Sequence, residues 1–492
     1  MKLNIAENCT IFSIVLMIIS VPGLICAEEV EDADITSHIE TEMWVDDAVP
    51  SNTIDVSTEE GIVTLSGTVN NILARDRAER IAEATVGVRS VVNKINVQPP
   101  VTWTDADVKD AVEMALINDP ATEAYEVRLK ADDGTVTLEG MVESWQEKQL
   151  AASVAKGVRG VRDIKNNITV NYKSQRGDFE IKKEIESRLE NDVRIDDNMI
   201  DVDVEDGEVK LDGTVGSLKE KNQAETDCWV AGVKGLDTDQ LQIKWWARDD
   251  MQRKDLYAYR EDSEIKQAVK DSFRYDPRVE PGQVRIDVDT GEVSLSGVID
   301  NLAEKRSAEN DARNTIGVTR VVNNLKVRPA LIPGNDELEN KVSRRLLSDP
   351  YTNRFDLEIS AYGGTVYLSG KVHTSWEKRH AGEIAGQIEG VSRVVNNISS
   401  ERQWSWKPDW QLKDNIERQY FWSPFVDGDQ VNVTVENGIA TLTGTVDTYS
   451  ERQSAEDNAF EGGAKDVVNN LMVSYRTYGP AEYGPYSPYY GF

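Results

Sequence analysis

The segment GEVKLDGTV at residues 207–215 decides the fold of this chain, because five related segments recur along it. Each copy carries a second glycine six residues after the first, and successive second glycines are 73, 73, 84, 73 and 74 residues apart. These repeat glycines are Gly67, Gly140, Gly213, Gly297, Gly370 and Gly444. So regular a period predicts six tandem copies of one small domain.

The residues around this segment predict a β-hairpin. In the third copy, Ile200, Val202 and Val204 alternate with acidic residues, which is the pattern of a strand with one buried face. The Asp206-Gly207 pair that follows favours a tight turn in which both central residues have positive φ. Apolar residues then alternate again, so the chain returns as a second strand.

Helices are expected on both sides of the hairpin. Apolar residues at helical spacing predict a first helix over 107–116 in the second copy and an alanine-rich second helix over 74–85 in the first copy. A final strand over 91–97 completes the unit. The expected fold class is therefore α+β, with six small α-β-β-α-β domains, and the final strand of the third copy is predicted least clearly.

The six copies form a duplicated block of three. Offsets of 230, 230 and 231 residues relate the first three copies to the last three. Asn118-Asp119-Pro120 of the second copy returns as Ser348-Asp349-Pro350 in the fifth. We expect domains at 33–99, 105–172, 177–246, 260–329, 335–400 and 408–475, with an inter-block linker at 247–259.

The first 27 residues predict export. Lys2 precedes an apolar run from Ile11 to Ile19, and the stretch ending at Ala27 fits a signal-peptidase site. Lipidation at Cys26 is the less favoured alternative, because Ile25 stands where a small residue is expected. Cleavage after Ala27 would leave Cys228 as the only cysteine. We expect a periplasmic protein with no transmembrane span in the mature chain.

Composition limits the partners. The chain has 492 residues and a formal net charge of −32. Because nucleic-acid binding depends on neutralising phosphates with Lys and Arg, a DNA or RNA partner is not expected. The tail at 476–492 is rich in Tyr, Gly and Pro and is predicted to be disordered.

The repeated helix-hairpin-helix-strand unit, with V-x-L-x-G in the hairpin and VVNN in several final strands, resembles the BON domain family. The resemblance covers nearly all of residues 33–475. It implies an exported envelope protein, similar to a periplasmic osmotic-stress protein, that binds phospholipid surfaces or another envelope component. It implies no enzyme activity and no cofactor.

The candidate sites have plain structural interpretations. The repeat glycines are expected to let a helix approach the sheet closely. His373 and His380 are too few for a zinc site, and no catalytic or metal-binding group recurs. The acidic run at 201–207 differs in spacing from a calcium loop and is read as a strand with a solvated face.

Tryptophans supply the interface candidates. Trp145 and Trp376 begin the second helices of the second and fifth copies, and Trp404 and Trp406 precede the sixth copy. Packing between domains is the simpler interpretation, and contact with lipid headgroups is the alternative. The sequence thus predicts a non-enzymatic envelope protein that binds phospholipid or an envelope component, with a periplasmic protein-protein scaffold or spacer as the alternative function.

Overall fold

The computed structural model describes residues 30–101, 103–122, 125–173, 176–244, 246–249, 260–401 and 407–474. The expected signal segment at 1–27 and the tail at 476–492 lie outside these residues. Helix α7 (Trp246–Asp249) covers the start of the expected linker, and the rest of that linker is outside the described residues.

Each of the six repeats forms the predicted α+β unit with a mixed sheet. The first repeat contains α1 (Asp32–Val45), η1 (Ser51–Thr53), β1 (Ile54–Glu59), β2 (Ile62–Val69), α2 (Ile72–Glu83) and β3 (Ser90–Val97). The second contains α3 (Asp105–Asn118), β4 (Glu126–Asp132), β5 (Thr135–Val142), α4 (Trp145–Lys156) and β6 (Asp163–Val170). The third contains α5 (Asp178–Asn191), η2 (Asp197–Met199), β7 (Ile200–Glu205), β8 (Glu208–Val215), α6 (Leu218–Asp227) and β9 (Gly235–Ile243).

The second block repeats this order. The fourth repeat contains α9 (Asp262–Ser272), β10 (Val284–Asp289), β11 (Glu292–Ile299), α10 (Leu302–Arg313) and β12 (Arg320–Val327). The fifth contains α11 (Asn335–Ser348), β13 (Leu357–Tyr362), β14 (Thr365–Val372), α12 (Ser375–Gly386), β15 (Arg393–Asn396) and β16 (Ser399–Ser400). The sixth contains α13 (Asp409–Trp422), η3 (Gly428–Gln430), β17 (Val431–Glu436), β18 (Ile439–Val446), α14 (Tyr449–Glu461) and β19 (Asp466–Val473).

The second strand lies at the centre of every sheet. In the first repeat β1 pairs antiparallel with β2, and β3 pairs parallel with β2. A parallel pair needs a crossover, which α2 supplies. The final strand of the third repeat, β9, also forms, but its register with β8 shifts between Lys210 and Asp212. That irregularity coincides with the loss of the VVNN sequence.

The hairpin turns match the sequence prediction. In all six repeats both central turn residues have positive φ, as at Asp206 (52°) and Gly207 (81°). The turn is also held by the first helix, because the Asp178 carboxylate accepts hydrogen bonds of 2.9 Å from the main-chain amides of both turn residues. Equivalent contacts are made by Asp32, Asp105, Asp262, Asn335 and Asp409.

The repeat glycines have a different cause from the expected one. A Cβ atom on Gly213 would lie 2.1 Å from the carbonyl oxygen of Met199, just before the paired first strand. In the six repeats the corresponding distance is 2.1–2.9 Å, and φ is between 121° and 156°. The expected close approach of a helix is therefore wrong. A neighbouring main-chain carbonyl and a positive φ require glycine here.

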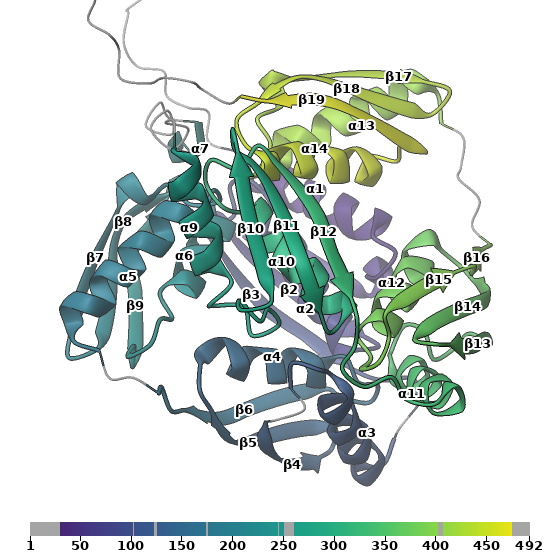
Figure 1. Cartoon of the computed structure of the whole chain (residues 1–492). Coiled ribbons are helices and arrows are strands. Elements are labelled where there is room, and N and C mark those ends of the chain that lie inside the picture. Colours follow the sequence, from purple (N-terminus) through teal and green to yellow (C-terminus); the bar gives the residue numbers. More distant parts are fainter. Residues whose placement is uncertain are drawn as a thin grey trace, which may run out of the picture.

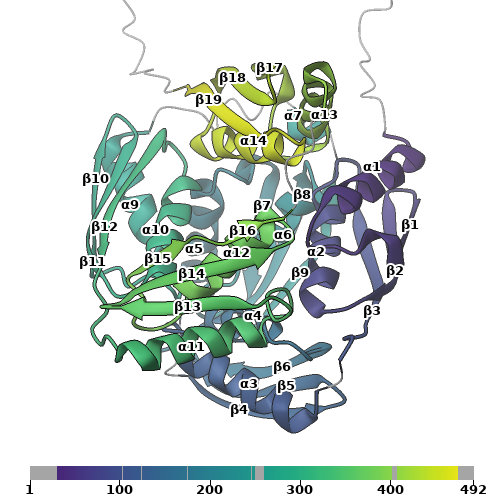
Figure 2. The ribbon, with the colours of Figure 1, turned by 90° about the vertical axis from the view of Figure 1, so that its right-hand side faces the viewer.

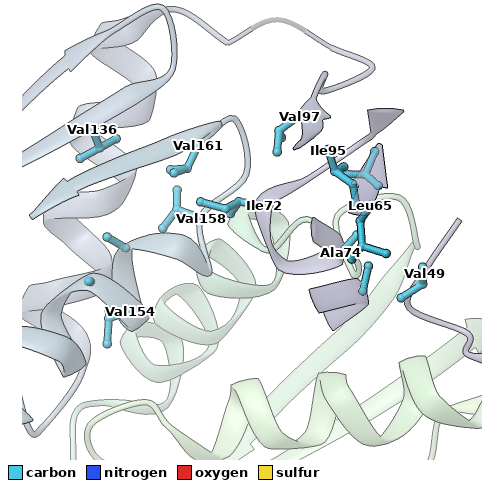
Figure 3. Close-up of a cluster of buried hydrophobic side chains, with 14 of the residues drawn as sticks. Val49, Leu65, Ile72, Ala74, Ile95, Val97, Val136, Val154, Val158 and Val161 are labelled. Carbon is cyan, nitrogen blue, oxygen red and sulfur yellow. The ribbon is translucent and has the colours of Figure 1, made fainter. Parts of the chain in front are cut away.

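The repeats assemble with their helices inward and their sheets outward (Figures 1 and 2). The cores of the first two repeats merge into one apolar cluster, in which Ile72 of α2 lies beside Val158 of the second repeat (Figure 3). Small residues make this possible, since Ala74, Ala78 and Ala82 bury one face of α2 completely. The second helices thus hold both the repeat core and the contacts between repeats.

Candidate functional site

Reciprocal hydrogen bonds join the second and fifth repeats. The main-chain amide of Arg159 donates to the carbonyl oxygen of Ser348 over 2.6 Å, and that of Glu389 donates to Asn118 over 3.3 Å. Each pair of equivalent residues is 230 positions apart. The two blocks of three are therefore related by an approximate two-fold rotation at this contact.

The repeated Asn/Ser-Asp-Pro sequence lies in this same contact. Asp119 and Asp349 both line a cavity of about 140 Å³ between the two repeats. Asp119 accepts a hydrogen bond from Arg278 of the fourth repeat at 3.0 Å, whereas Asp349 is bonded to His380 of its own repeat at 3.0 Å. Burial would raise the pKa of Asp349, but hydrogen bonding and attraction to His380 and Arg345 hold it below its usual value.

Trp145 and Trp376 pack between repeats. Trp145 of the second repeat stacks on Trp229 of the third, with ring centroids 5.4 Å apart. Trp376 stacks on His380 and meets the edge of Tyr351, whose hydroxyl donates to the carbonyl oxygen of Ala48 in the first repeat. Both tryptophans are half-buried. Trp404 and Trp406 lie outside the described residues.

The histidines and acidic residues form no metal centre in the part of the chain that the structure describes. His373 meets the edge of Phe355 at 5.0 Å, and His380 is largely buried against Asp349 rather than at the surface. The run at 201–207 forms the end of β7 and the hairpin turn, as expected. Cys228 is buried, and burial raises the pKa of its thiol.

One interface between repeats is built twice. The third and fourth repeats are joined by two main-chain hydrogen bonds, from Val193 to Asn314 and from Ile316 to Asn191. The sixth and first repeats meet at equivalent positions, through a stack of Trp422 on His38 with ring centroids 4.4 Å apart. The same sequence offset thus allows the two interfaces to be compared residue by residue.

The interface of the third and fourth repeats contains a cleft of about 1130 Å³, which the second repeat also borders through Trp145. Asn191 and Ala268 line this cleft at the positions that Trp422 and His38 occupy in the other interface. Small side chains replace a stacked pair of rings here. The cleft is therefore a specific feature of one interface rather than a general consequence of the repeat.

A buried ion pair lies in the cleft wall. Nη2 of Arg188 on α5 donates to Oδ1 of Asp227 on α6 over 2.5 Å, and Asp227 is 4% exposed. The Arg188 guanidinium also lies 3.9 Å from the centre of the Tyr275 ring, and the Tyr275 hydroxyl is bonded to Glu184. The pair is thus held by residues from both repeats.

Two further carboxyl groups face this pair. Asp192 accepts a hydrogen bond of 2.8 Å from Nε of Arg194, and Asp311 projects from α10 of the fourth repeat. Burial raises the pKa of Asp227 to about 6, although Arg188 opposes the change. Burial and the nearby Asp276 raise the pKa of Asp311 well above its usual range. The cleft therefore holds acids that ionise only reluctantly.

Sequence reasoning did not find this cluster. Arg188, Asp192, Arg194, Asp227 and Asp311 look like ordinary charged surface residues when read along the chain. One signal was available, because comparison across the duplication places uncharged residues at the equivalent positions of the other interface. These are Gln419, Ser423, Phe425, Asn458 and Ile81.

The fold and the cleft define a class of protein: a tandem-repeat protein whose small α+β domains assemble through their helices and enclose a polar cleft. Among the residues described, no helix has the length and apolar character needed to cross a membrane. The chain belongs to the BON domain family, whose model matches residues 31–99, 104–172, 177–244, 261–329, 334–401 and 408–475.

The chain is similar to two curated relatives over most of their length. It is 29% identical over 144 residues to the osmotically-inducible protein Y of Escherichia coli (strain K12), which covers 28% of this chain and 72% of the relative. It is 30% identical over 159 residues to the outer membrane lipoprotein DolP of Haemophilus influenzae, which covers 31% of this chain and 82% of that protein. The C-terminal domain of CdsD, a type III secretion protein of Chlamydia trachomatis, matches at 14% identity over 44% of this chain and 100% of that domain, with a TM-score of only 0.12.

Proposed function

We propose that this chain is a non-enzymatic exported protein of the cell envelope whose BON domains bind phospholipid surfaces or another envelope component, in the context of osmotic or envelope stress. The observation that carries the proposal is the similarity to an osmotically-inducible protein and an outer membrane lipoprotein over more than two thirds of each relative. Six domains held in one assembly would combine weak individual contacts by avidity.

Exposed aromatic residues near α1 and α13 supply a candidate membrane contact. Trp44 is 74% exposed and Trp410 is 72% exposed, although tryptophan is usually well buried. Phe421, also exposed, lies 11 positions after Trp410 and so projects from nearly the same face of α13. Tryptophan rings favour the headgroup region of a bilayer. These three residues therefore take the place of Trp145 and Trp376 as candidates for lipid contact.

Charge constrains which lipid surface is suitable. The net charge of −32 opposes contact with an anionic leaflet. Because salt screens this repulsion, binding to anionic vesicles should increase as salt is raised, whereas binding to neutral vesicles should change little. The same charge favours the second candidate function, a protein-protein scaffold that binds partners along the outer sheet faces, where Asp201 and Asp203 are exposed.

Co-sedimentation of residues 28–492 with neutral and anionic vesicles, at low and physiological salt, tests the proposal. We expect binding that persists at physiological salt and that falls when Trp44 and Trp410 are both changed to alanine. The matched control is Tyr362→Ala, because Tyr362 is 76% exposed on β13 in another repeat. If the chain is absent from every pellet, the scaffold function is favoured, and affinity capture from envelope extracts becomes the next measurement.

A further inference from the structure

The cleft between the third and fourth repeats contains more acid than the protein itself neutralises. Its inner wall brings together Arg188 and Arg194 with Asp192, Asp227 and Asp311, which is one carboxyl group more than the arginines can balance. A buried net charge is costly, so the cleft must take up one positive charge, either as a proton or as a bound cation.

Specific atoms in this wall lack partners. The buried Oδ2 atoms of Asp227 and Asp311 accept no hydrogen bond from any residue that the structure describes, and the buried Nη1 of Arg188 donates none. Buried polar atoms in folded proteins nearly always have partners. Two acceptors and one donor therefore remain for a ligand.

The fold does not require these charges. At the equivalent interface of the sixth and first repeats, Gln419 replaces Arg188, Asn458 replaces Asp227 and Ile81 replaces Asp311. That interface is filled by the stack of His38 on Trp422 and by a 2.6 Å hydrogen bond from Gln419 to Glu42. The chain thus builds the same junction once with neutral contacts and no charged cluster, so the open, charged version has another purpose.

We propose that this cleft is a binding site for a ligand that carries a primary ammonium group next to an oxygen acceptor, as in an amino alcohol. The N–H groups donate to the free Oδ2 atoms of Asp227 and Asp311, and the oxygen accepts from Nη1 of Arg188. The aromatic rings of Trp145 and Tyr275 border the same cleft and favour a cation beside them.

The ligand has two sources, a free amine or the ethanolamine headgroup of a lipid. The inference goes beyond the proposed function and does not depend on membrane binding, because free ethanolamine tests it alone. Phosphatidylethanolamine vesicles, compared with phosphatidylcholine vesicles, then test the lipid source. Choline is the matched free probe, since its quaternary nitrogen has no N–H group to donate.

Calorimetric titration of residues 28–492 with ethanolamine is the decisive experiment. Loss of one charge-assisted hydrogen bond should weaken binding about ten- to a hundredfold in Asp227→Asn and in Asp311→Asn. Asp227→Asn should fold, because the chain already has Asn458 at the equivalent position. Asp203→Asn, an exposed change of the same charge in the same repeat, should leave the affinity within about twofold, as expected for a surface charge.

A second variant blocks the cleft without removing its charges. Asn191→Trp combined with Ala268→His recreates the ring pair that fills the equivalent interface. It should abolish ethanolamine binding while circular dichroism shows an intact fold. If it also abolishes binding to phosphatidylethanolamine vesicles, the headgroup is a source of the ligand. If only free ethanolamine binds, the ligand is a soluble amine.

Binding should release a proton, because the ammonium group replaces the one held by the acid cluster. The measured heat should then depend on the ionisation enthalpy of the buffer, and affinity should rise between pH 5 and 7.5. The charged and titratable groups that face the cleft from each element are Glu184, Arg188, Asp192, Arg194, Asp227, Tyr275, Asp276 and Asp311. The proposal is overturned if wild type binds neither ethanolamine nor the phosphatidylethanolamine vesicles, if choline binds as tightly, or if the carboxamide variants bind as wild type does.

Discussion

The main-chain amide of Arg159 donates a 2.6 Å hydrogen bond to the carbonyl oxygen of Ser348, across the boundary between the second and fifth repeats. Its counterpart, from Glu389 to Asn118, lies on the other side of the same contact. Reciprocal contacts of this kind are typical of a symmetric dimer interface. In this chain they join two halves of one polypeptide, and they allow each interface to be tested against its copy.

Arg345→Ala should loosen the contact between the second and fifth repeats. The Arg345 guanidinium is largely buried there and donates to the carbonyl oxygen of Gly157 over 3.2 Å. Its loss removes a charged hydrogen bond, worth about 1.5–3 kcal/mol. Hydrogen exchange of the Arg159 amide should become about tenfold faster or more. Arg344→Ala, an exposed neighbour on the same helix, is the control, and equal exchange in both variants would contradict this role.

Gly213→Ala should destabilise the third repeat by at least about 2 kcal/mol, because the new Cβ meets the Met199 carbonyl and φ is positive. Cys228 provides a local probe, since it is buried in that repeat and is the only cysteine after residue 27. Its thiol should be labelled much faster in moderate urea. Gly177→Ala has nothing within 4 Å of the new Cβ and should label as wild type does.

Asp178→Ala should weaken the hairpin turn of the same repeat, because two main-chain amides lose a charged acceptor. We expect a loss of about 1–3 kcal/mol, again measured by labelling of Cys228. Asp178→Asn should retain part of the stability, since Asn335 fills this position in the fifth repeat. Equal loss in both variants would mean that the contact with the turn is unimportant.

Asp227→Asn should change the pH dependence of stability in the third repeat. Because burial raises the folded-state pKa of Asp227 to about 6, the folded state holds its proton longer than the unfolded state does. The stabilisation is fully present below about pH 4 and is lost as pH rises through about 6, a change of about 3 kcal/mol.

The variant should therefore become more stable relative to wild type between pH 4 and 7, as read from Cys228 labelling of both proteins at each pH. Asp203→Asn is the control, because Asp203 is exposed on β7. A constant difference between Asp227→Asn and wild type across this range would show that the carboxyl group is not held protonated.

The sequence by itself determined the repeat unit, its order of elements and its duplication. These features depend on short-range chemistry: alternating apolar residues form strands, helical spacing forms helices, and the Asp206-Gly207 turn needs positive φ. The repeat glycines were also found from the sequence, but their cause was not. The carbonyl of Met199 that excludes a side chain at Gly213 comes from a different strand, so only the paired sheet shows the clash.

Only the tertiary structure decided how the six repeats fit together and where the cleft opens. Arg188, Asp227 and Asp311 lie on three helices of two repeats, and nothing in their local sequence distinguishes them from solvated surface residues. The cleft exists because Asn191 and Ala268 leave space that Trp422 and His38 fill in the copied interface. Burial and charge balance arise only when separate helix faces meet, which is why the repeat pattern predicts the domain but not its site.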